Sequence, residues 1–140
     1  MKYAALDNHT YALRLEIGES VHTVLEAFCA EHKIGAASVQ GIGSFESPTL
    51  AHYSVKTKKY SEHVVPGVLE VTSLLGNVSV MDGSPLVHLH ATVAGPDMLA
   101  HAGHLAQGVC SATLELIVTA FDATLSKVKS EQVGLNLWDF

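Results

Sequence analysis

A succession of strand-like segments joined by short turns occupies the second half of the chain. Apolar residues recur in these runs with the alternation or continuity of buried strands, at residues 68–75, 77–81, 86–94 and 113–121. The turn at 82–85 contains Asp-Gly between two apolar runs, which is a strong hairpin signal. Because short connections join antiparallel neighbours, the sequence predicts a mostly antiparallel sheet.

One helix is expected to pack on this sheet. Strict alternation over Tyr11–Ile17 predicts a half-buried strand, and Ser20 follows as the expected N-cap of a helix that ends near His32. Four apolar residues of this helix recur at the spacing of one stripe: Val21, Val24, Leu25 and Phe28. Gly35 stands where a left-handed residue commonly ends a helix. These signals predict an α+β fold.

A glycine pair in the next segment resembles the start of a dinucleotide-binding fingerprint. Gly41 and Gly43 fit that motif, but Glu46 stands at the position of its third glycine, so a Rossmann domain is excluded. The two glycines instead predict a bulge or a close crossing of backbones. Beyond them, strand-like residues 49–54 and 60–65 flank a polar turn and predict a hairpin.

Length and composition indicate one compact domain over residues 1–140. With 140 residues, 48% of them hydrophobic, the chain has enough apolar side chains for a single core, which we place at about 10–122. The C-terminal segment 123–140 ends in alternating apolar residues, and we expect it to dock on the body or on a neighbouring subunit. Cys29 and Cys110 match no zinc-binding spacing and are expected to be buried free thiols.

The charge balance argues against a polyanionic partner. Eight basic against fourteen acidic residues give a net charge of −6, and Arg14 is the only arginine. Nucleic-acid binding normally requires an excess of Lys and Arg, so DNA is not the expected partner. No segment has the length and apolar character of a membrane helix, and the first residues lack a signal-peptide pattern, which predicts a cytoplasmic protein.

The nine histidines outnumber the basic residues, and three of them have a geometric reason to converge. Residues i and i+2 of a strand point to the same face, so His88 and His90 place two imidazoles side by side. His104 follows one hairpin later. Three histidine ligands with an open fourth position are typical of catalytic zinc, so this trio is the candidate site for zinc or another divalent transition metal.

A structural role remains the alternative for these histidines, which would then bond to backbone carbonyls and line a polar groove or a subunit interface. His101 is a spare candidate whose spacing from His104 suits a helix or a turn better than a strand. We expect the other histidines to lie at the surface: His9, His22, His32, His52 and His63.

A bound metal would polarise a water molecule or a substrate carbonyl, with a nearby carboxylate as proton carrier. Glu70, Asp97 and Glu115 are the acids nearest the relevant strands in the sequence. Glu115 is the catalytic candidate among them, and the alternative is that this strand carboxylate simply faces solvent. Arg14 is expected at the surface rather than at a substrate carboxylate. Asn77 lines the same groove or occupies a turn.

Several motifs together resemble the plant-and-prokaryote-conserved (PPC) domain. They lie in the family's order at residues 11–16, 39–44, 69–77, 82–90, 103–105 and 114–118. The resemblance implies an antiparallel sheet with a packed helix, a homotrimer, and a fold relationship to acetolactate decarboxylase-like metalloproteins that hold zinc with three histidines. It places the family's histidine cluster on His88, His90 and His104.

Three functions follow as expectations. The first is a homotrimer with a three-histidine metal site that also takes a small-molecule ligand, with catalysis unproven. The second is a DNA-binding or transcription-associated protein, as prokaryotic family members are often described, although this chain is acidic and has no Arg-Gly-Arg-Pro segment. The third is an oligomeric interaction module without a ligand.

Overall fold

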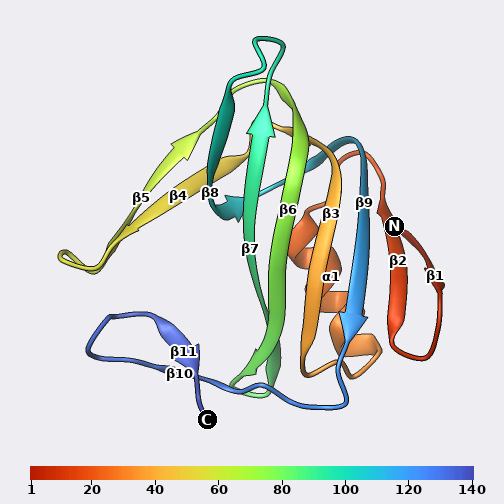
Figure 1. The fold of residues 1–140 in the computed structure, drawn as a ribbon, viewed down its shortest axis with the longest axis vertical. Coiled ribbons are helices and arrows are strands. Elements are labelled where there is room, and N and C mark those ends of the chain that lie inside the picture. Colours follow the sequence, from red (N-terminus) through yellow and green to blue (C-terminus); the bar gives the residue numbers. More distant parts are fainter.

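A computed structural model describes residues 1–140. It contains one helix and eleven strands, of which nine form one sheet and two form a small hairpin (Figure 1). The bounds are β1 Lys2–Ala5, β2 Thr10–Leu15, α1 Val21–Glu31, β3 Ala37–Glu46, β4 Thr49–Ser54, β5 Lys59–Val64, β6 Val68–Met81, β7 Ser84–Ala94, β8 Ala100–Gln107, β9 Cys110–Ala120, β10 Lys127–Lys129 and β11 Asn136–Trp138. No helix in it has the length and apolar character needed to cross a membrane.

The strands of the large sheet follow the order β1-β2-β9-β3-β6-β7-β8-β4-β5, and every neighbouring pair is antiparallel. The predicted α+β fold with a mostly antiparallel sheet and one packed helix is therefore confirmed. The hairpin at Asp82-Gly83 is also confirmed: both residues have positive φ, of 51° and 79°, as a two-residue hairpin turn requires.

The core lies between α1 and one face of the sheet. Val21, Leu25 and Phe28 of the predicted helical stripe are buried and belong to the main core cluster. On β7 the alternate residues Val87 and Leu89 are buried on the same side. The helix lies behind the sheet in Figure 1, and the opposite face carries no second layer.

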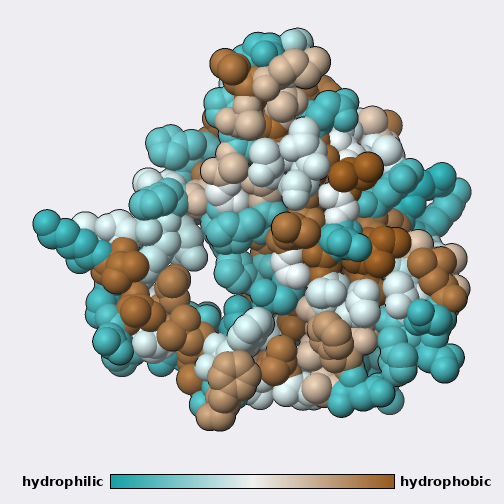
Figure 2. Space-filling model, in the orientation of Figure 1, coloured by the Kyte–Doolittle hydropathy of each residue, from teal (hydrophilic) through white to brown (hydrophobic).

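That uncovered face, called here the open face, carries exposed apolar side chains. Ile42 on β3 and Leu75 on β6 are 60% and 58% exposed. A groove on this face has a volume of about 770 Å³, and its lining also includes Tyr3, Glu115 and Ile117. Figure 2 shows apolar surface on this side of the molecule.

The helix has the predicted bounds, with Ser20 as N-cap and His32 as C-cap, but one detail differs at each end. The side chain of Ser20 makes no capping hydrogen bond, and the backbone N–H of Val21 donates to the Gly108 carbonyl. Lys33, not Gly35, has the left-handed conformation, with φ of 55°. Gly35 is needed for a different reason: a Cβ there would lie 2.6 Å from Oγ1 of Thr124.

Three further elements differ from the expectations. Residues 68–81 form one continuous strand, because Gly76 stays in register opposite Leu89 and does not interrupt β6. The short edge strand β1 and the β10–β11 hairpin have too few residues to show a period in the sequence. Residues 130–135, which connect β10 and β11, contact the β4–β5 hairpin: Tyr53 donates to the Val133 carbonyl at 2.7 Å, and Lys58 donates to the Glu131 carbonyl at 2.5 Å.

The predicted bulge at the glycine pair is confirmed, and it yields a stability prediction. The β3–β6 register shifts between Gly41 and Gly43, and Gly43 has a φ of 153°. A Cβ at Gly43 would lie 2.3 Å from the Thr113 carbonyl oxygen. We expect Gly43→Ala to lower the free energy of unfolding by about 1–3 kcal/mol in a urea titration.

Gly18→Ala is the matched control. Gly18 also has a positive φ, of 86°, but no atom would lie within 4 Å of its Cβ. The control therefore introduces backbone strain without a clash, and the loss should be smaller than at Gly43. An equal loss at the two positions would show that the close crossing of β3 and β9 is not what requires glycine.

Candidate metal centre

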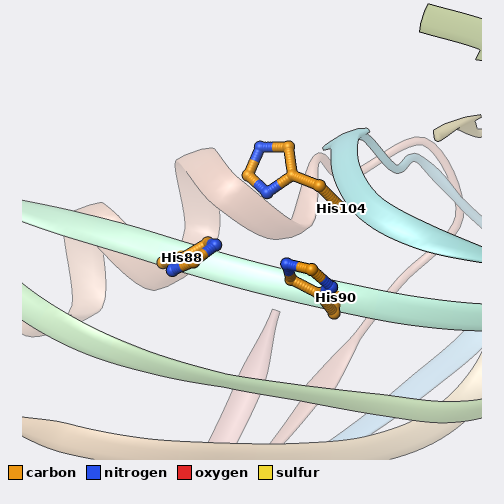
Figure 3. Close-up of side chains that lie close together, drawn as sticks. All are labelled: His88, His90 and His104. Atoms are coloured by element: carbon orange, nitrogen blue, oxygen red, sulfur yellow. The ribbon is translucent and has the colours of Figure 1, made fainter. Parts of the chain in front are cut away.

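Two neighbouring strands bring the three candidate histidines together. His88 and His90 lie on β7 and point to the side opposite Leu89, as the strand period requires. His104 lies on β8 and is the direct cross-strand partner of His90. The ring centroids are 5.2 Å apart for His88 and His90, 5.2 Å for His88 and His104, and 5.5 Å for His90 and His104. Figure 3 shows the three rings around a common space.

The nitrogen atoms of this cluster are placed for a shared ion. One ligand atom from each histidine lies within 4.8 Å of the other two. A tetrahedral zinc site with Zn–N distances of about 2.0–2.1 Å separates its nitrogens by about 3.4 Å, so small side-chain rotations are sufficient to close the site. The Nδ1 atom of His104 is buried and has no hydrogen-bond partner in the protein. A bound metal would satisfy this orphaned atom.

The environment favours the neutral imidazole, which is the form that binds a metal. Burial lowers the pKa of His88 to about 4, with smaller contributions from the charges of Lys127, His104 and His90. Burial also lowers the pKa of His104, assisted by neighbouring positive charges and opposed by the charge of Glu62. The two half-buried members of the trio are therefore unprotonated at neutral pH.

A cavity of about 540 Å³ opens beside His88 and His104. Its lining comes from four strands of the large sheet and from the C-terminal segment: Tyr60, Asn77, Leu86, Val87, His88, His104, Lys127, Gly134, Leu135, Asn136, Leu137 and Trp138. In Figure 1 the β4–β5 and β10–β11 hairpins reach toward each other on this side of the sheet, and Figure 2 shows an opening between them. A metal held by the three histidines would face a space large enough for a small molecule.

Asn77 lies in this cavity, directly opposite His88 in the β6–β7 pairing. Its Oδ1 atom is buried without a hydrogen-bond partner, as Nδ1 of His104 is. Of the two positions expected for Asn77, a groove or a turn, the structure shows the groove. Two orphaned polar atoms in one cavity indicate a place for a polar ligand.

The structure does not bring Glu115 to this cluster. Glu115 is exposed on β9, paired with Arg14 and Ile42, and β3 and β6 separate β9 from β7. Three strand spacings amount to about 14 Å, beyond the reach of a proton carrier in the same chain. Glu70 and Asp97 are exposed and also absent from the cavity lining, so no carboxylate lines the cavity. Arg14 is exposed, as expected.

The remaining histidines lie outside the trio. His9, His52 and His63 are exposed, as predicted, and His101 is exposed as well. The surface prediction is wrong for His22 and His32, which are half-buried on and beside α1. Burial lowers the pKa of His22, while a hydrogen bond with the Leu105 backbone acts in the opposite direction.

Sequence reasoning missed most of the cavity wall. The Tyr60 ring lies against the His104 ring at a tilt, with centroids 5.1 Å apart, and Lys127 lies on β10. Neither position has a local signal, because both reach the cavity only through the packing of the β4–β5 hairpin and the C-terminal segment.

The lowered pKa values give a prediction for the metal-free protein. Below pH 6.5 the unfolded chain protonates its histidines, whereas His88 stays neutral in the folded state until about pH 4. The unfolded state then binds more protons, so the folded state loses stability as the pH falls from about 6.5 to 4. We expect His88→Gln to reduce this loss in urea titrations across that range, and His63→Gln, at an exposed position, to leave it unchanged. An identical pH dependence of stability for the wild type and His88→Gln would show that the lowered pKa of His88 does not cause the loss.

The comparisons with known proteins agree with this fold. The chain belongs to the Plants and Prokaryotes Conserved (PCC) domain family, whose family model matches residues 4–122. The family resemblance stated from the sequence motifs is thereby confirmed. No curated protein matches the chain.

Several solved structures match nearly the whole length of this chain. A protein from Bacteroides thetaiotaomicron, whose name proposes DNA binding, is 31% identical with a TM-score of 0.94, and the match covers 99% of this chain and 96% of that one. A PPC protein from Pyrococcus horikoshii is 28% identical, with a TM-score of 0.88 and coverage of 95% and 92%. A metal-containing protein from Archaeoglobus fulgidus is 30% identical, with a TM-score of 0.87 and coverage of 100% of both chains.

The expected relationship to the acetolactate decarboxylase fold is also present. The α-acetolactate decarboxylase of Bacillus subtilis is 11% identical with a TM-score of 0.57, and the match covers 87% of this chain and 57% of that one. At this identity the likeness concerns the fold alone.

Proposed function

We propose that this protein binds a divalent transition metal, with zinc as the first candidate, through His88, His90 and His104, and that the metal binds a small molecule in the adjoining cavity. The observation that carries the proposal is the convergence of three imidazoles on one space, with Nδ1 of His104 buried and unpartnered. Three neutral nitrogen ligands leave one position of a tetrahedral zinc open to water or to a ligand.

The cavity favours binding over proton-transfer chemistry. A zinc ion supplies Lewis-acid polarisation of a bound oxygen, but acid–base catalysis also needs a proton carrier within hydrogen-bond reach. No carboxylate lines the cavity, and Glu115 lies on a different strand of the open face. Metal-dependent ligand binding is therefore the function that this chain's own residues support best. The metal-containing relative from Archaeoglobus fulgidus adds support from a protein of the same fold.

Elemental analysis of protein purified without a histidine tag tests the metal proposal. We expect one transition-metal ion per chain in the wild type and none above background in the variant with all three histidines replaced by alanine. A triple alanine variant of His52, His63 and His101, which are all exposed, serves as the control. Equal metal content in the two triple variants would overturn the proposal.

A homotrimer is proposed as the form in which the site functions. The open face presents Ile42 and Leu75 to solvent, an arrangement that a second copy of the chain would cover. Sedimentation equilibrium should give three times the chain mass of 14.9 kDa. Leu75→Glu should dissociate the assembly, because it places a charge in the apolar contact. A monomeric wild type would rule the trimer out, and deletion of residues 135–140 shows whether the C-terminal segment contributes to it.

DNA binding is the second candidate, because the name of the Bacteroides thetaiotaomicron relative proposes it. Three lysines lie at the β4–β5 hairpin and two on β10: Lys56, Lys58, Lys59, Lys127 and Lys129. The net charge of −6 opposes this function. Fluorescence anisotropy with duplex DNA at low and moderate salt tests for DNA binding, since phosphate contacts produce a steep salt dependence. We expect no binding at either salt concentration.

A further inference from the structure

One positive charge stands alone in the cavity beside the histidines. Lys127 is the only acidic or basic residue, histidines aside, among the twelve residues of the lining. Its Nζ forms no ion pair, in contrast to Lys2 and Lys129, which lie 3.5 Å and 3.9 Å from carboxylate oxygens. Lys127 is also half-buried, and burial lowers the pKa of its ammonium group. An ammonium group in such a place is costly unless a negative charge accompanies it.

The fold holds Lys127 in this position. It pairs with Trp138 in the β10–β11 hairpin, and the preceding residue Ser126 forms a parallel bridge with Val80 of β6. Its charge is close enough to lower the pKa values of His88 and His104. The same charge would repel a metal ion on the histidines, and Glu62, the carboxylate whose charge raises the pKa of His104, lies outside the lining. A ligand that carries a negative charge would relieve both the unpaired ammonium and this repulsion.

We infer that the cavity takes a small monocarboxylate, whose carboxylate lies between the metal and Lys127 and whose hydrocarbon part lies against Leu86, Leu137 and Trp138. This inference rests on the proposed function, because the histidine-bound metal forms one side of the site. The unpartnered Oδ1 of Asn77 in the same lining suits a hydroxyl donor on such a ligand.

The wall of the cavity favours a carboxylate over a phosphate. Phosphate sites typically use arginine, a helix N-terminus or a run of backbone N–H groups. The cavity has none of these: its lining comes from strands and the C-terminal segment, and the only arginine, Arg14, lies elsewhere on the open face. One lysine beside several apolar side chains is suited to one negative charge on an organic molecule.

Calorimetric titration of the Co²⁺-loaded protein tests the inference. The probes are butyrate, isovalerate and hexanoate, each compared with its neutral amide, together with inorganic phosphate. We expect at least one carboxylate to bind about tenfold more tightly than its amide, which corresponds to about 1.4 kcal/mol. If no carboxylate binds more tightly than its amide, or if phosphate binds more tightly than all three, the inference is overturned.

Variants of Lys127 test whether its charge is the one that holds the carboxylate. Lys127→Met, which keeps an unbranched side chain as far as Cε and removes the charge, should weaken carboxylate binding about tenfold, and Lys127→Arg should restore most of it. Lys129→Met changes an exposed lysine on the same strand and should have no effect. Unchanged carboxylate binding in Lys127→Met would show that the charge of Lys127 does not hold the ligand.

The visible absorption of Co²⁺ reports metal binding separately from ligand binding. A wild type that does not bind Co²⁺ contradicts the proposed function as well as this inference. A wild type that binds Co²⁺ but shows no preference for carboxylates over amides contradicts only the inference. Lys127→Met should bind Co²⁺ at least as tightly as the wild type, because it removes a repulsive charge.

Discussion

His104→Ala is expected to weaken zinc binding by at least about 100-fold. His104 belongs to the cluster in which each histidine offers one ligand atom within 4.8 Å of the others. Even the loss of a group that only orients a metal ligand costs about 10- to 100-fold in affinity, so the loss of one of three ligands should cost more. Competition with a chromophoric chelator measures the zinc affinity of each variant directly.

His101→Ala is the matched control for this variant. His101 lies on the same strand, three residues earlier, and is exposed outside the cluster. It should bind zinc as the wild type does. Because Nδ1 of His104 is buried without a partner, the alanine variant should also fold without losing a protein hydrogen bond there. Equal zinc affinities for His104→Ala and the wild type would exclude His104 as a ligand.

Leu89→Ala is expected to have the largest effect on stability. Leu89 is fully buried, lies between His88 and His90 in the sequence, and belongs to the core cluster beneath the sheet. Removal of a buried leucine side chain costs about 2–5 kcal/mol of unfolding free energy, because the transfer term and the cavity term add. Urea titration of the metal-free protein at one fixed protein concentration measures this loss.

His90→Ala tests whether the two sides of β7 have separate roles. His90 is exposed, so its replacement should change the unfolding free energy of the metal-free protein by no more than about 0.5 kcal/mol. The Leu89→Ala variant retains all three histidines, so it should still bind zinc under conditions in which the variant is folded. A large stability loss in His90→Ala would contradict a division of β7 into a core side and a ligand side.

The sheet and the histidine trio were accessible from the sequence because both follow from local spacing. The turn at Asp82-Gly83 and the alternation along 86–94 identify a hairpin strand, and the period of two then places His88 and His90 together. His104 follows because one turn reverses the chain and pairs it with His90. The glycine pair at 41 and 43 was likewise interpretable as a bulge.

The rest of the site depends on contacts between distant segments. Lys127 reaches the cavity because the C-terminal segment folds back along the sheet and contacts Tyr53 and Lys58. Glu115 is near the histidine strands in sequence, yet two strands intervene in the sheet, since strand order is not chain order. His22 is half-buried because its helix packs over the sheet, which the spacing of one histidine does not reveal.

X-ray absorption spectroscopy of the zinc-loaded protein tests the central claim most directly. We expect three nitrogen ligands at about 2.0–2.1 Å with the outer-shell signature of imidazole, and a fourth light ligand in the remaining position. The two thiols, Cys29 and Cys110, are buried in the core and should take no part. A spectrum with sulfur at about 2.3 Å, or without the imidazole signature, would contradict a three-histidine metal centre.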